Sequence, residues 1–262
     1  MPLTYVSHQV PALAAKLAQP RWFDGTALAL GSMSPDWPFV LAGSRFAFNS
    51  HATKPVLAFC VPVSVAGAMA TRWLAPTAAQ YLPELPGLPL RRLALLGEHR
   101  PHVAVTVLSA LAGAWSHVAW DSFTHDGRWG ARNVRWLAST HHVNGRPMTG
   151  ASLAQYGCTL AGGVVSTVLL GRALGELPGW VSKEGSDAQT VTAADDRPDA
   201  PAGGGTRFWG AVAAGTAAGL AWAASGDRYP GPLVIRISFG TAAGAVLGTI
   251  WARRKLRRPA SA

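Results

Sequence analysis

The chain has 262 residues, of which 49% are hydrophobic and only 14% are charged, and its mean hydropathy is +0.17. Soluble domains carry about 25% charged residues, so this composition excludes an ordinary soluble protein and predicts a membrane protein. The net charge of +10 does not indicate a nucleic-acid partner, because the densest basic cluster (253–258) directly follows the last apolar segment. A basic cluster in that position is typical of an anchor to anionic membrane lipid, which is the partner we expect.

The chain opens with residues 1–54, which carry no signal-peptide pattern, since Met1 to Gln9 lack a basic charge and Pro11 interrupts the next apolar run. We expect this stretch to form a helical segment packed at the membrane interface. Five later segments approach the roughly 20 apolar residues needed to cross a bilayer. The predicted fold class is therefore all-α, a polytopic helical membrane protein with about five transmembrane helices, at 55–74, 102–120, 150–171, 208–226 and 232–252.

Composition divides the chain into three predicted parts. Residues 1–175 form a helical membrane domain that carries the candidate site. Residues 176–206 are rich in Pro, Gly and Asp and predict a disordered linker. Residues 207–262 predict a two-helix membrane scaffold with a basic tail. Glycines four residues apart in this last part favour close helix packing in lipid.

The basic tail also predicts the orientation of the chain. The positive-inside rule places this tail in the cytoplasm, so we expect a multi-pass protein of the inner (plasma) membrane with a cytoplasmic carboxyl terminus. One further consequence holds for either orientation. Because one predicted span separates residues 1–54 from the second span, the amino-terminal segment and the end of that span share a membrane face.

The most informative motif closes the second apolar segment. His117 and Asp121 are four residues apart, so a helix places them on one face, and His125 follows one turn later. Ionisable groups at the end of a membrane-length helix are costly there and indicate a functional site. A structural hydrogen-bonded pair is the simpler interpretation of His117 and Asp121 taken alone.

If residues 1–54 and the end of the second span share a membrane face, His8, Asp36 and His51 can lie beside this motif. A hydrolytic metal centre needs imidazole and carboxylate ligands and an open position for water. Mixed nitrogen and oxygen donors favour a divalent metal, zinc above all, with manganese or iron as alternatives. His125 is either a further ligand or a catalytic general acid and base, because an imidazole titrates near neutrality. The predicted ligands are His8, Asp36, His51, His117 and Asp121.

With these residues identified, the chain resembles a family of bacterial integral membrane proteins catalogued as domain of unknown function 4184. The resemblance rests on Pro2-Leu3-Thr4 leading to Ser7-His8, on residues 31–38, on Ser50-His51, on residues 116–125 and on Gln155-Tyr156-Gly157. A looser similarity, in the order His, Asp, His, His-x-x-x-Asp, links it to membrane-bound metal-dependent hydrolases and the helical zinc phospholipase C group. Those phospholipases are soluble, and this chain lacks a clear glutamate general base.

Three functions remain open at this level. The first is a metal-dependent hydrolase acting at the membrane interface on a lipid or phosphoester. The second is a non-catalytic membrane scaffold or sensor whose His/Asp cluster is structural or vestigial. A transporter ranks below both, because the polar residues gather at one interface rather than at the bilayer midplane, where transport sites usually lie.

Overall fold

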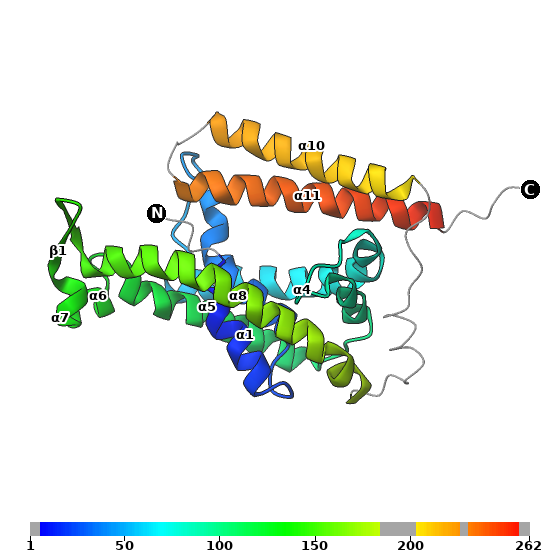
Figure 1. Cartoon of the computed structure of the whole chain (residues 1–262), viewed down its shortest axis with the longest axis horizontal. Helices are drawn as coiled ribbons and strands as arrows, with labels where there is room; N and C mark the ends of the chain where they lie inside the picture. Colours follow the sequence, from blue (N-terminus) through cyan, green and yellow to red (C-terminus); the bar gives the residue numbers. More distant parts are fainter. Residues whose placement is uncertain (1–5, 184–202, 226–229, 257–262) are drawn as a thin grey trace, which may run out of the picture. The chain divides into compact units, whose positions relative to one another are not determined.

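The computed structural model describes residues 6–183, 203–225 and 230–256. The predicted all-α class is confirmed, with one two-stranded hairpin as the exception among the described residues (Figure 1). The chain divides into two compact units. Unit 1 comprises Met1–Pro38, Phe48–Gly67 and His102–Leu170, and unit 2 comprises Phe39–Ala47, Ala68–Pro101 and Gly171–Ala262.

Four helical segments of the described residues are long and apolar enough to cross a membrane. Most of the predicted segment 208–226 lies in the helix α10 (Gly204–Ala224), but this helix falls outside the group of four. Its glycine, threonine and tryptophan residues contribute little hydropathy, which explains the difference from the predicted number of about five. The four segments are Thr53–Tyr81, Val103–Asn133, Gly150–Lys183 and Gly231–Arg254.

Unit 1 begins with short helices, as expected for the amino-terminal segment. These are α1 (Gln9–Ala18), α2 (Gly25–Met33) and the 3₁₀ helix η1 (Ser34–Leu41). The Asp24 carboxylate caps α2 by accepting the backbone N–H groups of Thr26 and Ala27. Its second oxygen accepts the Thr106 hydroxyl of α5 at 2.8 Å. The cap of α2 therefore also ties the amino-terminal segment to the second span.

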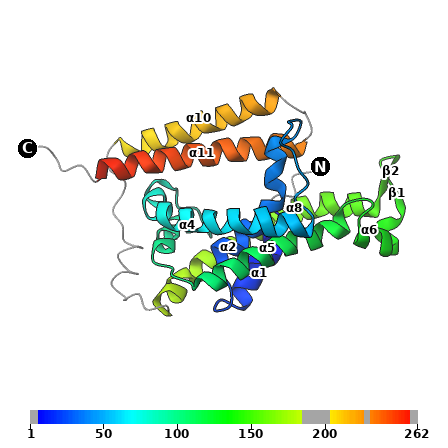
Figure 2. The same ribbon diagram turned by 180° about the vertical axis from the view of Figure 1, so that it is seen from behind.

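The helix α5 (Val103–Thr124) packs against α2 so closely that the two backbones are in contact (Figure 2). A Cβ atom on Gly31 would come within 2.3 Å of the carbonyl oxygen of Ala110. In the same way, a Cβ atom on Gly113 would come within 2.2 Å of the Leu28 oxygen. Small residues are what allow helix backbones to approach this closely. The glycine pair thus fixes where the end of α2 meets α5.

The first span consists of α3 (Thr53–Pro55), the π-helix η2 (Val56–Cys60), α4 (Val61–Ala78) and the 3₁₀ helix η3 (Ala79–Tyr81). Within unit 1, buried Val56 and Cys60 of this span pack on Ala114 of α5. This contact holds the segment just before the span, which contains His51, near the carboxyl-terminal half of α5.

The segment after α5, which lies between the predicted spans 102–120 and 150–171, is structured. It contains α6 (Trp129–Asn133), α7 (Arg135–Ala138) and an antiparallel hairpin of β1 (Thr140–Val143) and β2 (Arg146–Thr149). Asn144 and Gly145 both have positive φ, 50° and 75°, as a tight Asn-Gly hairpin turn requires. The helix α8 (Gly150–Lys183) follows directly, so it continues past the linker boundary predicted at residue 176. Residues 184–202 of that predicted linker lie outside the described residues.

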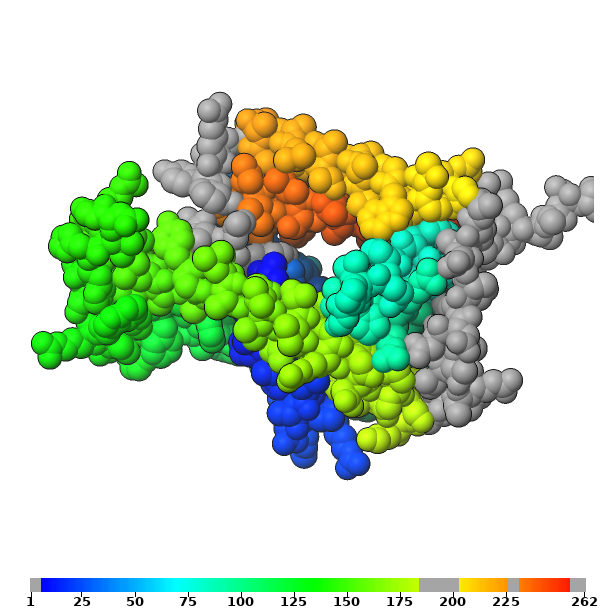
Figure 3. Space-filling model, in the orientation of Figure 1, coloured from blue at the N-terminus to red at the C-terminus, as the bar shows by residue number. Residues whose placement is uncertain are grey.

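Unit 2 contains the 3₁₀ helix η4 (Leu90–Gly97) and the antiparallel pair α10 and α11 (Pro230–Leu256). The two helices, coloured from yellow through orange to red, lie side by side along their length (Figures 1, 2 and 3). A Cβ atom on Gly215 would meet the Gly240 oxygen at 2.3 Å, and one on Gly240 would meet the Gly215 oxygen at 2.3 Å. The predicted close packing of the last two helices is therefore present.

The close approach of α2 and α5 generates the first prediction. Gly113→Ala should lower the free energy of unfolding by about 1–3 kcal/mol, because the new methyl group overlaps the α2 backbone. The measurement is thermal unfolding of the full chain in detergent, followed by circular dichroism. Gly157→Ala on α8 is the matched control, because a Cβ atom there meets nothing within 4 Å. Equal effects of both substitutions would contradict the proposed packing role.

Candidate metal centre

The site is built around His117 on α5. Its Nδ1 lies 2.8 Å from the backbone oxygen of Ser32, at the end of α2. A carbonyl oxygen only accepts hydrogen bonds, so Nδ1 carries the proton and donates it. The other ring nitrogen, Nε2, faces the cluster, and it carries the lone pair when the ring is neutral. In metalloproteins, a hydrogen bond from one ring nitrogen to a backbone carbonyl orients the histidine in the same way.

Two carboxylates and a second imidazole surround this nitrogen. Asp121 comes from the next turn of α5, and Asp36 from η1 directly after α2. His51 comes from the segment before the first span, where the hydroxyl of its neighbour Ser50 donates a hydrogen bond to the Pro35 carbonyl. That bond links the His51 segment to the η1 backbone one residue before Asp36.

Four donor atoms from these residues form a compact cluster. His117 Nε2 lies 3.3 Å from His51 Nε2, 3.5 Å from Asp36 Oδ1 and 3.5 Å from Asp121 Oδ2. His51 Nε2 lies 3.6 Å from Asp36 Oδ1 and 3.3 Å from Asp121 Oδ2. Ligands about 2.1 Å from one tetrahedral ion are separated by about 3.4 Å. These five distances therefore match the spacing between ligands of one ion, and His51, His117 and Asp121 form one of the groups that could hold it.

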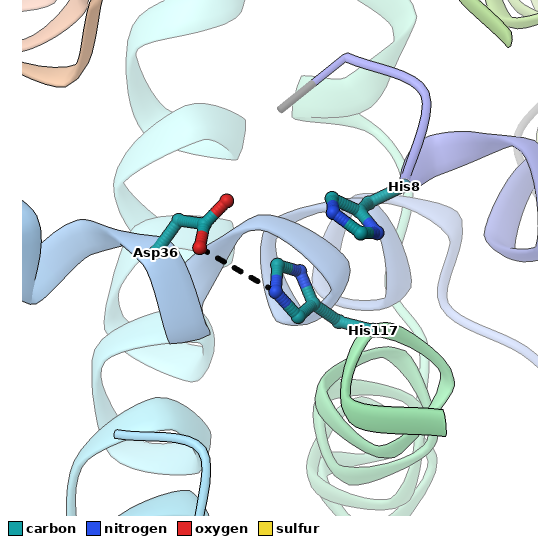
Figure 4. Close-up of side chains that lie close together, drawn as sticks. All are labelled: His8, Asp36 and His117. Atoms are coloured by element: carbon teal, nitrogen blue, oxygen red, sulfur yellow. Dashed lines mark ion pairs between the residues drawn. The ribbon is translucent and has the colours of Figure 1, made fainter. Parts of the chain in front are cut away.

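His8 is the residue that precedes α1, and it lies beside His117. Its ring stacks on the His117 ring with centroids 3.8 Å apart (Figure 4). The Nε2 atom lies 3.4 Å from Asp121 Oδ1, yet neither ring nitrogen of His8 has a hydrogen-bond partner. His8 is only 1% exposed, so its imidazole is buried without a hydrogen bond, which is rare for a buried polar group. His8, Asp36 and His117 also form a group whose ligand atoms lie within 4.8 Å of one another.

His125 occupies the accessible edge of the cluster. Its side chain is 18% exposed, whereas the side chain of Asp121 is 3% exposed. Its Nδ1 lies 3.3 Å from Asp121 Oδ1, and its Nε2 lies 2.9 Å from the amide nitrogen of Gln155. Because the amide nitrogen only donates, Nε2 accepts and the proton of neutral His125 is held at Nδ1, facing Asp121.

Gln155 on α8 is the site residue that sequence reasoning missed. It had been noted as part of the Gln155-Tyr156-Gly157 motif without a role at the site. A glutamine near the start of an apolar helix carries no ligand signal by itself. The available signal was that it interrupts an otherwise apolar helix face, and the structure gives this buried side chain a partner in His125.

Charge is unevenly distributed over the histidines outside the spans. Burial lowers the pKa of His8 to about 4, and His117 acts in the same direction. Burial would also lower the pKa of His51, but hydrogen bonds to Asp121 and Asp36 raise it above its ordinary value. Burial opposes ionisation of Asp36, yet the charge and hydrogen bonds of His117 and His51 hold its pKa below the ordinary range. Near neutrality His8 is thus an uncharged imidazole beside ionised Asp36.

The structure therefore brings together all six residues selected from the sequence. The remaining histidines, which the sequence analysis left out, do not enter the metal-type groups found among the described residues. His102, for example, caps α5 by accepting the backbone N–H of Ala104. The six are His8, Asp36, His51, His117, Asp121 and His125.

Comparison with protein families gives one match, to the Domain of unknown function (DUF4184), over residues 1–199. The chain belongs to this family, as the motifs had indicated. The Pro2-Leu3-Thr4 motif lies outside the described residues, whereas the others lie within unit 1. No curated protein and no solved structure matches significantly, so the looser similarity to hydrolases and phospholipases gains no support.

The unsatisfied imidazole generates the second prediction. In metal-free protein, His8→Leu should leave the free energy of unfolding unchanged or raise it by about 1–3 kcal/mol, because it removes a buried polar group without hydrogen bonds. Added zinc should raise the unfolding temperature of the wild type more than that of the variant. Thermal unfolding with EDTA and with zinc measures both effects. Strong destabilisation in EDTA would mean that His8 stabilises the metal-free fold.

Proposed function

We propose that the chain binds one divalent metal ion at the His/Asp cluster and uses it for hydrolysis. The observation that carries this proposal is the spacing of Asp36 Oδ1, His51 Nε2, His117 Nε2 and Asp121 Oδ2, which lie 3.3–3.6 Å apart in every measured pair. Hydrogen bonds alone do not account for this cluster, because each imidazole nitrogen faces several partners at once. An ion at its centre would satisfy all four atoms together.

The donor set supports one ion rather than two. Both metal-type groups in the structure include His117, which offers only Nε2 because Nδ1 donates to Ser32. His8 would be a fifth candidate donor, from the side of Asp121 Oδ1. Two imidazoles and two carboxylates suit zinc, and also manganese or iron, whose larger coordination numbers leave positions open. When bound, such an ion supplies a Lewis acid for a phosphoryl or acyl oxygen.

His125 is the proposed general acid and base. It holds a proton at Nδ1 against Asp121 and is oriented from the opposite side by Gln155. It also has the most exposed side chain of the six, 18%, so it lies where a substrate would reach the cluster. Proton transfer by a histidine held in this way contributes typically 10²–10⁴-fold to a rate.

The substrate class follows from the location of the cluster. His117 and Asp121 lie in the second half of α5 (Val103–Thr124), and α5 belongs to a helical segment that is long and apolar enough to cross a membrane. We therefore propose a lipid or another phosphoester at the membrane interface as the substrate. The proposed location of the protein is the plasma membrane, and the positive-inside rule places its basic carboxyl terminus in the cytoplasm.

A second candidate function follows from the same geometry. Four protein donors close a tetrahedral shell, as they do in structural zinc sites, and a closed shell leaves no position for water. In that case the cluster belongs to a non-catalytic scaffold or sensor. The two functions agree on metal binding and differ only in turnover, so two separate experiments distinguish them.

Metal content tests the shared premise. The full chain is purified in detergent, stripped with EDTA, reloaded with zinc and analysed by elemental mass spectrometry. His117→Ala with Asp121→Ala should remove bound zinc, because two of the four clustered donors are lost. His141→Ala with His142→Ala is the matched control, because it removes two imidazoles on β1, outside the cluster. Equal zinc in wild type and the His117/Asp121 variant would refute the site.

Turnover separates the hydrolase from the scaffold. His125→Gln should retain zinc yet hydrolyse a phosphoester, such as phosphatidic acid in vesicles, about 10²–10⁴-fold more slowly than wild type. Phosphate release from zinc-loaded protein is the readout, with the zinc-free cluster variant as the blank. If wild type binds zinc but releases no more phosphate than the blank, the scaffold or sensor function is supported instead.

A further inference from the structure

Unit 2 contains a pocket that is independent of the proposed metal site. Its volume is about 420 Å³, within the usual range for small-ligand sites. It is formed by α4, by the segment after η4 and by the end of α11. The lining residues include Arg72, Trp73, Glu98, His99, Arg100 and Arg253.

The pocket lining carries an excess of positive charge. Three arginines, Arg72, Arg100 and Arg253, line the pocket together with one carboxylate residue, Glu98, so the formal charge of these four side chains is +2. These arginines come from three separate stretches of sequence that the fold of unit 2 brings to one cavity. Arginine forks bind phosphate through paired charge-assisted hydrogen bonds, so this combination is suited to a phosphate group.

One of these arginines is held in a fixed position. The Arg253 guanidinium lies 4.3 Å from the centroid of the Trp73 ring and donates a hydrogen bond to the Trp73 backbone oxygen. A guanidinium has five N–H donors in a planar fork, a geometry that matches phosphate oxygens. Stacking on an aromatic ring reduces the entropy that Arg253 would lose on binding. The arginine is therefore preorganised at the pocket wall.

The rim of the pocket is apolar and exposed. Trp73 is 49% exposed and Met69 is 62% exposed, and both lie on the helical run Thr53–Tyr81. Arg253 lies at the end of the candidate span Gly231–Arg254. A cationic cavity beside an apolar rim, at the end of a membrane-length helix, matches an anionic headgroup that carries acyl chains.

From these observations we propose that this pocket binds a phosphate monoester or diester group, either as the headgroup of an anionic lipid or as free phosphate. Arg72, Arg100 and Arg253 contact the phosphate oxygens, and Trp73 with Met69 contacts the attached apolar part. Such a pocket differs from a basic tail that is attracted to a membrane by charge alone. Its arginines come from three stretches of the chain and line one cavity.

Binding to the full chain in a neutral detergent tests the pocket. The probes are dihexanoyl phosphatidylglycerol, dihexanoyl phosphatidylcholine and inorganic phosphate, each titrated by calorimetry. Arg72→Gln with Arg100→Gln should weaken phosphatidylglycerol binding at least about tenfold, because it removes two charge-assisted contacts. Arg172→Gln with Arg254→Gln is the matched control. It removes the same charge from two exposed arginines of unit 2 that do not line the pocket.

The outcomes distinguish the two sources of phosphate. Loss of phosphatidylglycerol binding in the Arg72/Arg100 variant alone, with no binding of inorganic phosphate, identifies a lipid site. Inorganic phosphate that binds and competes with the lipid identifies a phosphate site that also accepts headgroups. Equal weakening in both variants, or equal binding of phosphatidylcholine, would overturn the proposal in favour of unspecific attraction. Arg100→Gln alone, at an exposed position, gives the same comparison if the double variant misfolds.

Discussion

The contact between α2 and α5 sets the geometry on which the candidate metal centre depends. Gly31 and Gly113 let the two backbones approach so closely that a methyl group on either would overlap the other helix. That approach brings the Ser32 carbonyl within 2.8 Å of His117 Nδ1 and determines which ring nitrogen faces the cluster. It also directs η1, and therefore Asp36, toward the same point. A shift of one helix against the other would move a ligand, its hydrogen-bond partner and a carboxylate together.

The cost of burying the cluster is the second constraint. Asp36, His117 and Asp121 are 4%, 0% and 2% exposed, and His8 keeps two ring nitrogens without hydrogen bonds. Buried carboxylates without compensation are expensive, and imidazolium partners offset only part of that cost in a low-dielectric site. The divalent cation that we propose would supply positive charge and coordinate several lone pairs at once. This is the physical reason for proposing an ion at the cluster rather than pairwise hydrogen bonds alone.

The sequence predicted which side chains form the cluster better than it predicted the contacts that hold them. The spacing of His117 and Asp121 places them on one helix face wherever that helix lies. Counting spans was enough to expect His8, Asp36 and His51 beside them. The Ser32 carbonyl has no side-chain signature, and Gln155 acts only through a tertiary contact with His125. The hairpin at Asn144-Gly145 carries a local signal, because an Asn-Gly pair favours the positive φ angles that a tight hairpin turn requires.

Hydropathy and helix packing give different numbers of membrane crossings. Tyr81, at the end of the first span, clusters with Phe208 near the start of α10 and Ala252 near the end of α11, so these three positions share one side. If the first three candidate spans each cross, α8 also ends on that side. For α11 to end there as well, α10 must carry the chain across first. The antiparallel pairing of Gly215 with Gly240 supports such a crossing. The helix α10 has too low a hydropathy to be a candidate span by itself, but α11 covers its glycine face. If α10 crosses together with α11, the number of crossings is five, as expected from the sequence.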